Sequence, residues 1–301
     1  MPNKTLRCGT ARLCVALLLM SGSVAGCERV VSVTLPTSAP RLVVEARLER
    51  IRGKVSGNQE IRLSATDDYF SRSAPPAVTN ATVRVADSTD RVYAFIPSPS
   101  TPGSYVASGL TIVTGARYTL RITWQGDEYE ATERAMAGVP IDSLYFKAAS
   151  EQGSILGPAP TGGGLRATFD VIDPKGIANF YLWDQFVDGK RTVTTDTTSF
   201  GFYRAAFSDE FIDGGTLKDL QPYGGVTVRS GQLVLIRQLA ISAQAYRFYN
   251  SLSTQAINDG SPFSVQPTSV RGNVANRTRP SQLALGYFIV GEVTDVQARV
   301  P

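Results

Sequence analysis

Short runs of alternating hydrophobic and polar residues cover most of the chain after residue 40. In the clearest run, 118–124, Tyr118, Leu120, Ile122 and Trp124 alternate with polar residues. Alternation with a period of two places the hydrophobic side chains on one face of a half-buried strand. Such runs recur between turn-forming clusters roughly every 8–15 residues along the chain. The pattern is typical of β-sandwiches and β-barrels rather than of helical bundles.

The same reasoning predicts strands over the rest of the chain and one tight hairpin. Residues Gln125–Asp127 contain a glycine and separate two alternating runs, 117–124 and 128–134, which we expect to pair. The remaining predicted strands cover residues 81–85, 141 onward, 165–172, 177–187, 199–207, 232–240, 283–291 and 293–300.

One segment departs from the β pattern. Ala245, Tyr249, Leu252 and Ala256 recur at helical spacing, and Ser242 is a favourable N-cap before them. The sequence Asn258-Asp259-Gly260 then supplies a helix stop. The spacing predicts a helix over residues 243–257. We expect its aromatic stripe to pack on a sheet, with ligand stacking by Tyr246, Phe248 and Tyr249 as the alternative.

The predicted strands fall into two groups, which Ala137-Gly138-Val139-Pro140 separates. Proline and glycine at this position are typical of a boundary between domains. We therefore expect a mostly β protein with two β-sandwich-like domains and one main helix, at 243–257. The first domain, 41–138, would be immunoglobulin- or transthyretin-like, and the second, 140–301, would be larger. Val139-Pro140 leaves almost no linker, so their contact is expected to be large.

The first 26 residues have the features of a lipoprotein signal peptide. Basic residues precede a compact hydrophobic core at 13–20, which is too short to span a bilayer as a helix. The core leads to Val24-Ala25-Gly26-Cys27, which fits a lipoprotein cleavage site with acylation of Cys27. The alternative is an ordinary secretory signal followed by a chance cysteine. Residues 27–40 would then be a lipidated tether, anchored stably by two or three acyl chains.

Removal of this signal changes both the charge and the cysteine content. The full chain of 301 residues has 30 basic and 26 acidic residues, and 3 of the basic ones precede Cys27. The mature chain therefore has 27 basic against 26 acidic residues, so we expect no nucleic-acid partner. Cys8 and Cys14 would leave with the signal, and no thiol would remain free. We expect no disulfide and no thiolate chemistry.

Catalytic signals are scarce. The chain contains no histidine, which excludes Ser-His-Asp hydrolysis, histidine-ligated zinc and histidine as a general base. It has no nucleophile elbow and no phosphate-binding glycine loop. A pair of carboxylates for glycoside hydrolysis stays open, because such pairing is spatial and no motif marks it. We expect no enzyme activity and no cofactor.

The stretch 208–215 offers a candidate cation site. Asp209, Glu210 and Asp213 cluster beside two glycines, and calcium prefers oxygen ligands from such loops. The spacing is not that of an EF-hand loop, and a solvated turn explains the same residues. Trp183, Tyr203 and Tyr223 form a candidate stacking platform for a ligand, with a place in the core or in a hairpin pair as the preferred interpretation.

Ordered short motifs along the chain resemble domain-of-unknown-function family 4249, lipoproteins of the Bacteroidota. Each motif is weak alone, but their order and spacing are specific together. Two late ones, 271–276 and 285–288, contain Gly272 and Gly286, for which turn or bulge geometry is preferred over a binding role. The other matching pieces are Cys27-Glu28, 42–46, 61–64, 68–70, 78–83, 103–105, 115–120, 139–142, 208–214, 245–249, 262–263.

The resemblance implies an outer-membrane lipoprotein that serves as an accessory or capture subunit of a TonB-dependent receptor. The membrane, through the lipid anchor, and this receptor are the expected partners. Alternatives are a lipoprotein that binds a saccharide or peptide by itself, and a structural or adhesive module of the envelope. Glu28 is followed by Arg29, Val30 and Val31 rather than by an acidic run, so the periplasmic and surface faces both stay open.

The expected compartment also suggests sites of modification. Ser88, Ser143 and Thr197 each follow an aspartate in a pattern that resembles the O-glycosylation site of exported Bacteroidota proteins. The loops 67–77, 153–164 and 208–215 are the predicted docking surfaces for the receptor, because a core does not need them.

Overall fold

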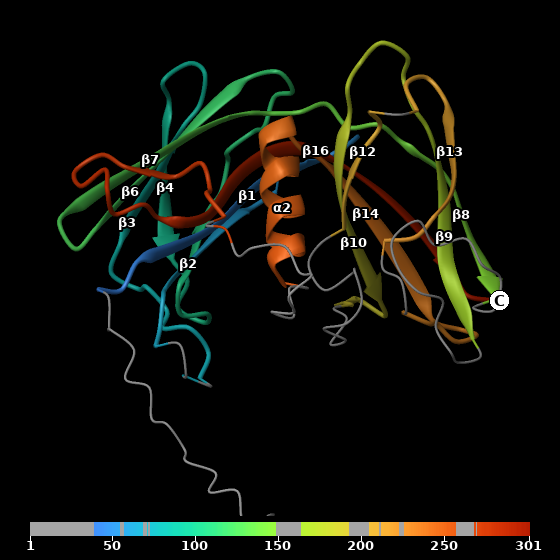
Figure 1. The fold of residues 1–301 in the computed structure, drawn as a ribbon, viewed down its shortest axis with the longest axis horizontal. Helices are drawn as coiled ribbons and strands as arrows, with labels where there is room; N and C mark the ends of the chain where they lie inside the picture. Colours follow the sequence, from blue (N-terminus) through green and yellow to red (C-terminus); the bar gives the residue numbers. More distant parts are fainter. Residues whose placement is uncertain are drawn as a thin grey trace, which may run out of the picture. The chain divides into compact units, whose positions relative to one another are not determined.

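The structure is a computed structural model of the chain, which divides into two compact units, Met1–Ala39 and Pro40–Pro301. The residues whose structure is described are 39–54, 57–68, 71, 73–148, 164–192, 205–210, 212–222, 226–256, 268 and 270–301. The second unit is mostly β with one main helix, which confirms the predicted fold class (Figure 1).

Strands form two sheets in the second unit. The larger sheet has the order β11-β10-β14-β16-β1-β2-β5-β4-β3-β6-β7-β15, and β12 pairs with β10; the smaller has the order β13-β9-β8. The strands are β1 (Leu42–Ile51), β2 (Gln59–Ala65), β3 (Thr82–Ala86), β4 (Val92–Pro97), β5 (Ser104–Ala107), β6 (Arg117–Trp124), β7 (Asp127–Arg134), β8 (Ile141–Ala148), β9 (Leu165–Ile172), β10 (Phe180–Val187), β11 (Lys190–Arg191), β12 (Ala205–Ser208), β13 (Thr216–Leu220), β14 (Leu233–Ala240), β15 (Ala275–Asn276) and β16 (Leu285–Arg299).

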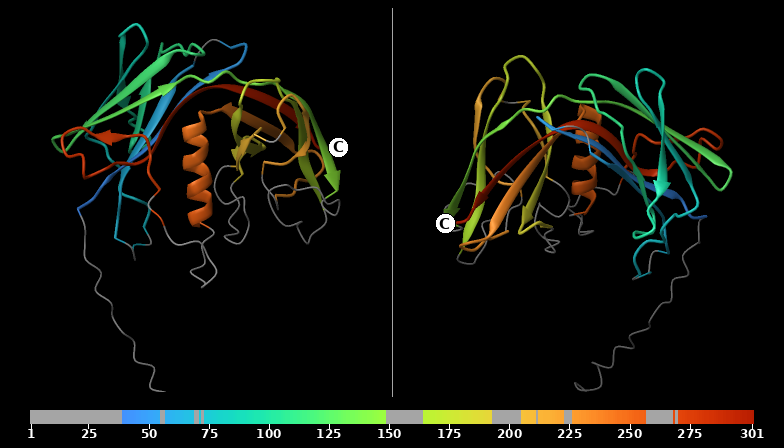
Figure 2. Two further views of the ribbon diagram at one scale, coloured as in Figure 1. Left: turned by 45° about the horizontal axis from the view of Figure 1, so that its top comes forward. Right: turned by 180° about the vertical axis from the view of Figure 1, so that it is seen from behind.

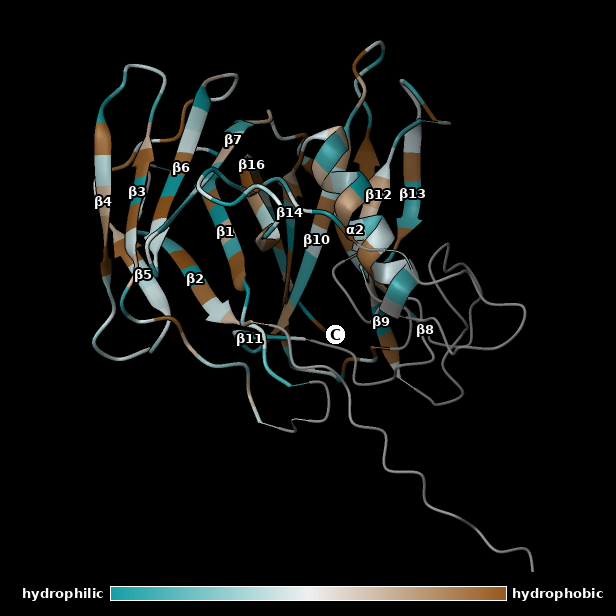
Figure 3. Ribbon diagram, turned by 60° about the vertical axis from the view of Figure 1, so that its left-hand side comes forward, coloured by the Kyte–Doolittle hydropathy of each residue, from teal (hydrophilic) through white to brown (hydrophobic). Residues whose placement is uncertain are grey.

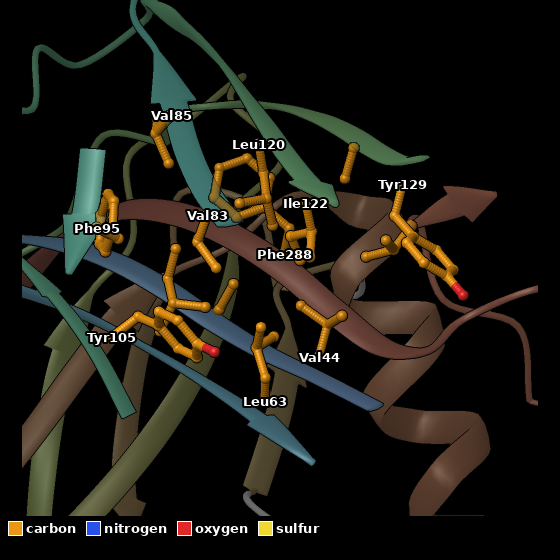
Figure 4. Packing of buried hydrophobic residues seen from close by; sticks show 14 of the residues in the cluster. Val44, Leu63, Val83, Val85, Phe95, Tyr105, Leu120, Ile122, Tyr129 and Phe288 are labelled. Carbon is orange, nitrogen blue, oxygen red and sulfur yellow. The ribbon is translucent and has the colours of Figure 1, made fainter. Parts of the chain in front are cut away.

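The first half of this unit is a sandwich-like pair of layers. One layer contains β1, β2 and β5, and the other contains β3, β6 and β7. Strand β4 connects them, because it pairs with β3 through 92–95 and with β5 through Ile96 and Pro97. Figure 4 shows side chains from both layers meeting between them, including Val44, Leu63, Leu120 and Phe288. This burial of apolar surface is the main stabilising contribution of the first half.

Alternation is visible along the strands, as the sequence predicts (Figure 3). In β6, Tyr118, Leu120, Ile122 and Trp124 are all buried, while the intervening residues are more exposed. The β6–β7 hairpin closes at Gln125 and Gly126, which both have positive φ (51° and 80°). Positive φ at both central residues defines the turn type that matches the twist of paired strands. The predicted hairpin is confirmed.

The second half has its own apolar layer between β10, β14 and β16 on one side and β8, β9 and β13 on the other. Phe169 and Trp183 pack edge-to-face at 5.1 Å between ring centroids, and Trp183 stacks on Phe207 at 5.2 Å. The indole Nε1 of Trp183 donates to Gln238, so its one polar group is satisfied within the core.

Strand β16 joins the two halves. The sequence predicts two strands here, 283–291 and 293–300, and that prediction is wrong, because Leu285–Arg299 is one continuous strand. It pairs in parallel with β1 along 285–293 and antiparallel with β14 along 293–299. Gly291 does not make a turn; a Cβ at this position would lie 2.0 Å from the carbonyl oxygen of Ala240. The glycine lets two backbones approach closely within the sheet.

The predicted domain boundary lies directly on β16. The backbone N–H of Gly138 donates to Glu292, and the carbonyl of Val139 accepts from Thr294 and Gln238. Residues Pro40–Pro301 thus form one compact unit with a shared sheet. Whether 41–138 and 140–301 fold as separate domains stays a prediction.

Helix α2 (Ala243–Ala256) covers the face of the sheet opposite to the second sandwich core. The predicted helix is therefore confirmed. Figure 2 shows it lying beneath the arch that β1 and β16 make. Ala245 and Phe248 pack against Leu182, Leu239 and Ile289. Within the part of the chain that the structure describes, no helix has the length and hydrophobicity needed to cross a membrane.

The late motif around Gly272 and Gly286 has a structural role. Gly286 has φ +86° and pairs with Val44. A Cβ on Gly286 would lie 2.0 Å from the Val44 carbonyl oxygen, and one on Gly272 would lie 1.7 Å from the Gly286 oxygen. The Asn273 amide exchanges two hydrogen bonds with the backbone of Phe288 and so continues the ladder of β16. These contacts favour the turn-or-bulge interpretation for Gly272 and Gly286.

We expect Gly286→Ala to destabilise the protein by about 3 kcal/mol, because it adds steric overlap to an unfavourable backbone conformation. The matched control is Gly189→Ala, which has a similar φ of +77° but nothing within 4 Å of the added Cβ. The control is expected to cost only about 1 kcal/mol. Thermal or urea unfolding measures both, and equal losses would contradict close packing at Gly286.

Candidate functional site

A groove lies on the face of the sheet that α2 covers in part. Its volume is about 1040 Å³, and strands β1, β2, β10, β14 and β16 contribute its floor. Small-molecule sites are concave and usually enclose roughly 300–1,000 Å³. The described residues that line it are Val43, Val44, Glu45, Ala46, Arg47, Glu49, Ile51, Lys54, Gly57, Asn58, Gln59, Glu60, Arg62, Asp184, Phe186, Arg191, Arg237, Phe248, Tyr249, Leu252, Leu285, Gly286 and Tyr287.

The two faces of β1 explain why the floor is polar. Leu42, Val44, Ala46 and Leu48 are buried in the first sandwich core. The alternate residues line the groove, and between Val43 and Ile51 they are all charged: Glu45, Arg47 and Glu49. Because successive side chains of a strand point to opposite faces, a strand that is apolar on the core side carries its charges into the groove.

A chain of alternating charges crosses the floor. It runs Arg191, Asp184, Arg47, Glu49, Arg237, Asp295, and its members come from β11, β10, β1, β14 and β16. The nitrogen–oxygen distances along it are 2.6, 2.9, 2.6, 3.4 and 2.8 Å. Opposite charges at each step compensate one another, so the network as a whole is neutral.

The Arg47–Asp184 pair at the centre of the network is largely removed from water, and the other members are partly exposed. Only 3% of the Asp184 side chain and 15% of the Arg47 side chain are exposed. Burial by itself lowers the pKa of Arg47, but the carboxylates of Glu49 and Asp184 outweigh it and raise that pKa above its usual value. The hydrogen bond to Asp295 raises the pKa of Arg237 against the opposing effect of burial. Both arginines therefore stay charged throughout the physiological range.

Aromatic side chains form the walls. Phe248 and Tyr249 of α2 pack edge-to-face with 5.2 Å between ring centroids, and Phe248 lies 5.0 Å from Tyr287. On β10, the ring of Phe186 lies 5.7 Å from the guanidinium carbon of Arg237. Burial raises the pKa of Tyr249 to about 12 although Arg47 opposes the shift. The tyrosine therefore keeps its hydroxyl proton at neutral pH.

The N-terminus of α2 is fixed to the first sandwich. The Ser242 hydroxyl caps the helix by accepting from the Ala245 N–H at 3.2 Å, as predicted, and it donates to Glu133 of β7 at 3.1 Å. Glu133 is buried, and burial raises its pKa; hydrogen bonds from the Arg134 N–H and Ser242 offset this only in part. This contact holds the helix, and with it one wall of the groove, in place.

The arrangement has the chemical features that suit an uncharged or charge-balanced molecule. It offers guanidinium donors, carboxylate acceptors and aromatic rings on rigid strands and a helix. In the described ranges of the chain, no group of three or more histidine, cysteine, aspartate or glutamate residues could hold a metal ion.

The predicted cation-site residues have structural partners. The carboxylate of Asp209 accepts from the N–H of Asn179 at 2.8 Å, and that of Asp213 accepts from the N–H of Gly176 at 2.5 Å. Glu210 is exposed in the same loop. Burial and then the nearby charges of Asp209 and Asp213 raise the pKa of Asp173, whose carboxylate accepts from the Gly214 N–H. Cation binding at 209–213 stays a prediction.

The predicted modification sites lie in different environments. Ser88 is exposed in the turn between β3 and β4, where the Asp87 carboxylate accepts from the Thr89 N–H. Ser143 is half-buried in β8. Thr197 and the predicted acylation site, Cys27, lie outside the described residues, so lipidation and glycosylation stay predictions.

Of the candidate stacking platform, only Trp183 lies within the described residues. Trp183 is fully buried in the second core, so it cannot meet a ligand, and the preferred core interpretation holds for it. Tyr203 and Tyr223 lie outside the described residues. On α2, Phe248 is buried and Tyr246 lies 5.4 Å from Phe180, as core packing requires. Of the predicted docking loops, 67–77 and 208–215 are described except for residues 69, 70, 72 and 211, and 153–164 only at Gly164.

Sequence reasoning missed the charged network. Its members come from positions as far apart as 47 and 295, and nothing in the sequence links them. The only local signal was a run in which charged residues alternate with apolar ones, such as Glu45-Ala46-Arg47-Leu48-Glu49. A solvated sheet face would have the same pattern, so the sequence cannot distinguish the two.

Fold and groove together define a mostly β protein whose shared sheet carries sandwich-like layers on one face, and a helix and a charged groove on the other. Its family is now clear. A family model described as a domain of unknown function (DUF4249) matches residues 28–297, so the chain belongs to this family, as its motifs predict. A search of curated proteins finds no match.

We expect Asp184→Ala to destabilise the protein by about 3–5 kcal/mol, because it leaves buried Arg47 and its neighbour Arg191 without their shared carboxylate. The control is Arg62→Ala, which breaks the exposed Arg62–Glu60 pair (2.9 Å) and should cost at most about 1 kcal/mol. Urea unfolding at neutral pH measures both changes. A loss for Asp184→Ala no larger than for Arg62→Ala would show that the network is not buried in solution.

We expect Glu133→Gln to raise the thermal unfolding midpoint at pH 7. The folded-state pKa of Glu133 lies above its unfolded value, so the folded state binds the extra proton. Its contribution to stability is fully present below the unfolded pKa and is lost as pH rises through the folded pKa. The gain should shrink at pH 4. The exposed Glu128, replaced by Gln, is the control, and an equal gain at both pH values would argue against a buried Glu133.

Proposed function

We propose that this protein is a non-catalytic, lipid-anchored protein of the cell envelope that captures a ligand for a TonB-dependent outer-membrane receptor. The observation that carries the proposal is the groove of about 1040 Å³, whose charged floor and aromatic walls suit binding. Family membership alone assigns no activity, since the family is one of unknown function.

Two sequence features support the capture role. The lipoprotein signal ending at Cys27 would confine the protein to a membrane leaflet, which raises its effective concentration near an integral receptor. The absence of histidine removes the commonest general base and leaves binding as the simpler use of the site. Partner class and outer-membrane location come from the family resemblance and belong to the proposal.

A second candidate function follows from the same groove. The groove lies on the second compact unit alone, so the protein could bind its ligand without a receptor and act as a stand-alone binding lipoprotein. The two functions differ in whether a β-barrel receptor accompanies the protein. A structural or adhesive role would use neither the groove nor a receptor.

We expect affinity purification of the tagged full-length protein from detergent-solubilised envelopes to recover one stoichiometric TonB-dependent receptor. Mass spectrometry identifies the partner, and labelling with an alkyne fatty acid reports acylation in the same preparation. Cys27→Ser is the matched control, which should lose the label and most of the receptor. Recovery of the acylated protein alone in repeated purifications would reject the receptor role and favour stand-alone binding.

A further inference from the structure

The charge balance of the groove restricts what it can bind. Its described lining has five basic residues, Arg47, Lys54, Arg62, Arg191 and Arg237, and four acidic ones, Glu45, Glu49, Glu60 and Asp184. Arg237 also pairs with Asp295 outside the lining at 2.8 Å, which brings the acids to five. The groove has no net charge that would attract an ionic ligand. Such a ligand would also have to displace an existing ion pair, whose nitrogen–oxygen distance is 2.6–3.4 Å.

The floor also excludes recognition through a strand edge. Strands β10, β14, β16, β1 and β2 are consecutive in the sheet, and each inner strand has partners on both sides. Their backbone N–H and C=O groups are therefore already engaged, and a peptide cannot add to them as a further strand. Only side chains face the groove, so a ligand must match guanidinium and carboxylate groups that lie side by side.

Hydroxyl groups match such pairs. A hydroxyl both donates and accepts, so it can donate to a carboxylate and accept from the adjacent guanidinium without breaking the ion pair. Arg47 and Asp184 offer such a pair, with 2.9 Å between Nη1 and Oδ2. The Nε of Arg47 is buried and has no hydrogen-bond partner among the described residues, so a further acceptor oxygen would satisfy it.

Aromatic and apolar side chains line the same space. Tyr249, Phe248 and Leu252 of α2 stand on one side, and Phe186 of β10 also lines the groove. Tyr249 is half-buried. Aromatic faces are suited to the C–H faces of a molecule whose edges are hydroxylated. The charged chain extends over five strands, so its length fits a ligand built from more than one such hydroxylated unit.

From these four observations we infer that the groove binds a neutral oligosaccharide, with hydroxyls on the Arg47–Asp184 pair and a ring face on Tyr249. The inference rests on the proposed function, because it names the class of ligand captured. Glu45 is exposed at the groove, so its carboxylate offers a further acceptor for hydroxyl protons. In the strand register, Glu45 lies opposite Arg62.

Calorimetric titration of the full-length protein in detergent tests this with a defined set of probes. The neutral probes are maltohexaose, cellohexaose, xylohexaose, mannohexaose and chitohexaose. The comparison probes are hexagalacturonate, which is anionic, and N-acetyl-tetraalanine amide, a neutral peptide. We expect saturable binding of at least one neutral oligosaccharide, and none of the comparison probes to bind as tightly.

Variants locate the binding. Tyr249→Ala and Glu45→Gln are expected to weaken it at least tenfold, while Arg121→Ala, at an exposed ion pair with Glu130 on β6, leaves it unchanged. Glu45→Gln changes an exposed residue and keeps the test valid if Tyr249→Ala unfolds. No binding by any neutral probe, tighter binding of a comparison probe, or unchanged binding in both groove variants would overturn the inference.

Receptor recovery separates this inference from the proposed function. If the wild-type protein recovers a receptor but binds no neutral oligosaccharide, only the ligand class is wrong. If it binds one through Tyr249 and Glu45 but recovers no receptor, the ligand class holds and the receptor role fails.

Discussion

The two-sided burial of β16 is the constraint on which the rest of the structure depends. One face of this strand contributes Phe288 and Val290 to the first core, and the other contributes Tyr287, Ile289 and Val293 to the layer beneath α2. Both of its edges are also used, by β1 and by β14. Because both faces and both edges of this central strand are engaged, it fixes its neighbours: a shift in register by one residue would move all of these side chains to the wrong face.

This constraint explains the glycines and the asparagine around the strand. Gly286 and Gly291 allow the backbones of β1 and of the end of β14 to approach without a Cβ in between. Asn273 supplies from its side chain the donor and acceptor that Phe288 would otherwise lack on its free edge. Satisfying each backbone group in this way avoids the cost of about 1–3 kcal/mol for an unpaired buried polar group.

In the groove, the sheet carries charged side chains instead of a second apolar layer. Replacing a buried ion pair by well-packed apolar residues is often neutral or stabilising, so the network of Arg47, Asp184 and Glu49 is weak support for stability. Its position on a concave face beside Tyr249 and Phe186 agrees with the binding role that we propose for the groove. Helix α2, fixed through Ser242 to Glu133, defines one limit of that surface.

The sequence by itself determined local structure here. Alternation in 118–124 predicted β6, the glycine in 125–127 its hairpin turn, and Ser242 with the spacing of Ala245 and Tyr249 the start of α2, since neighbouring residues decide each of these. It did not distinguish one strand at 285–299 from two, because Gly291 suggests a break unless the nearby Ala240 carbonyl is known. Only the tertiary structure decided which charged faces are buried. Arg47, Asp184 and Arg237 are far apart in sequence and meet only because β1, β16, β14 and β10 lie side by side in one sheet.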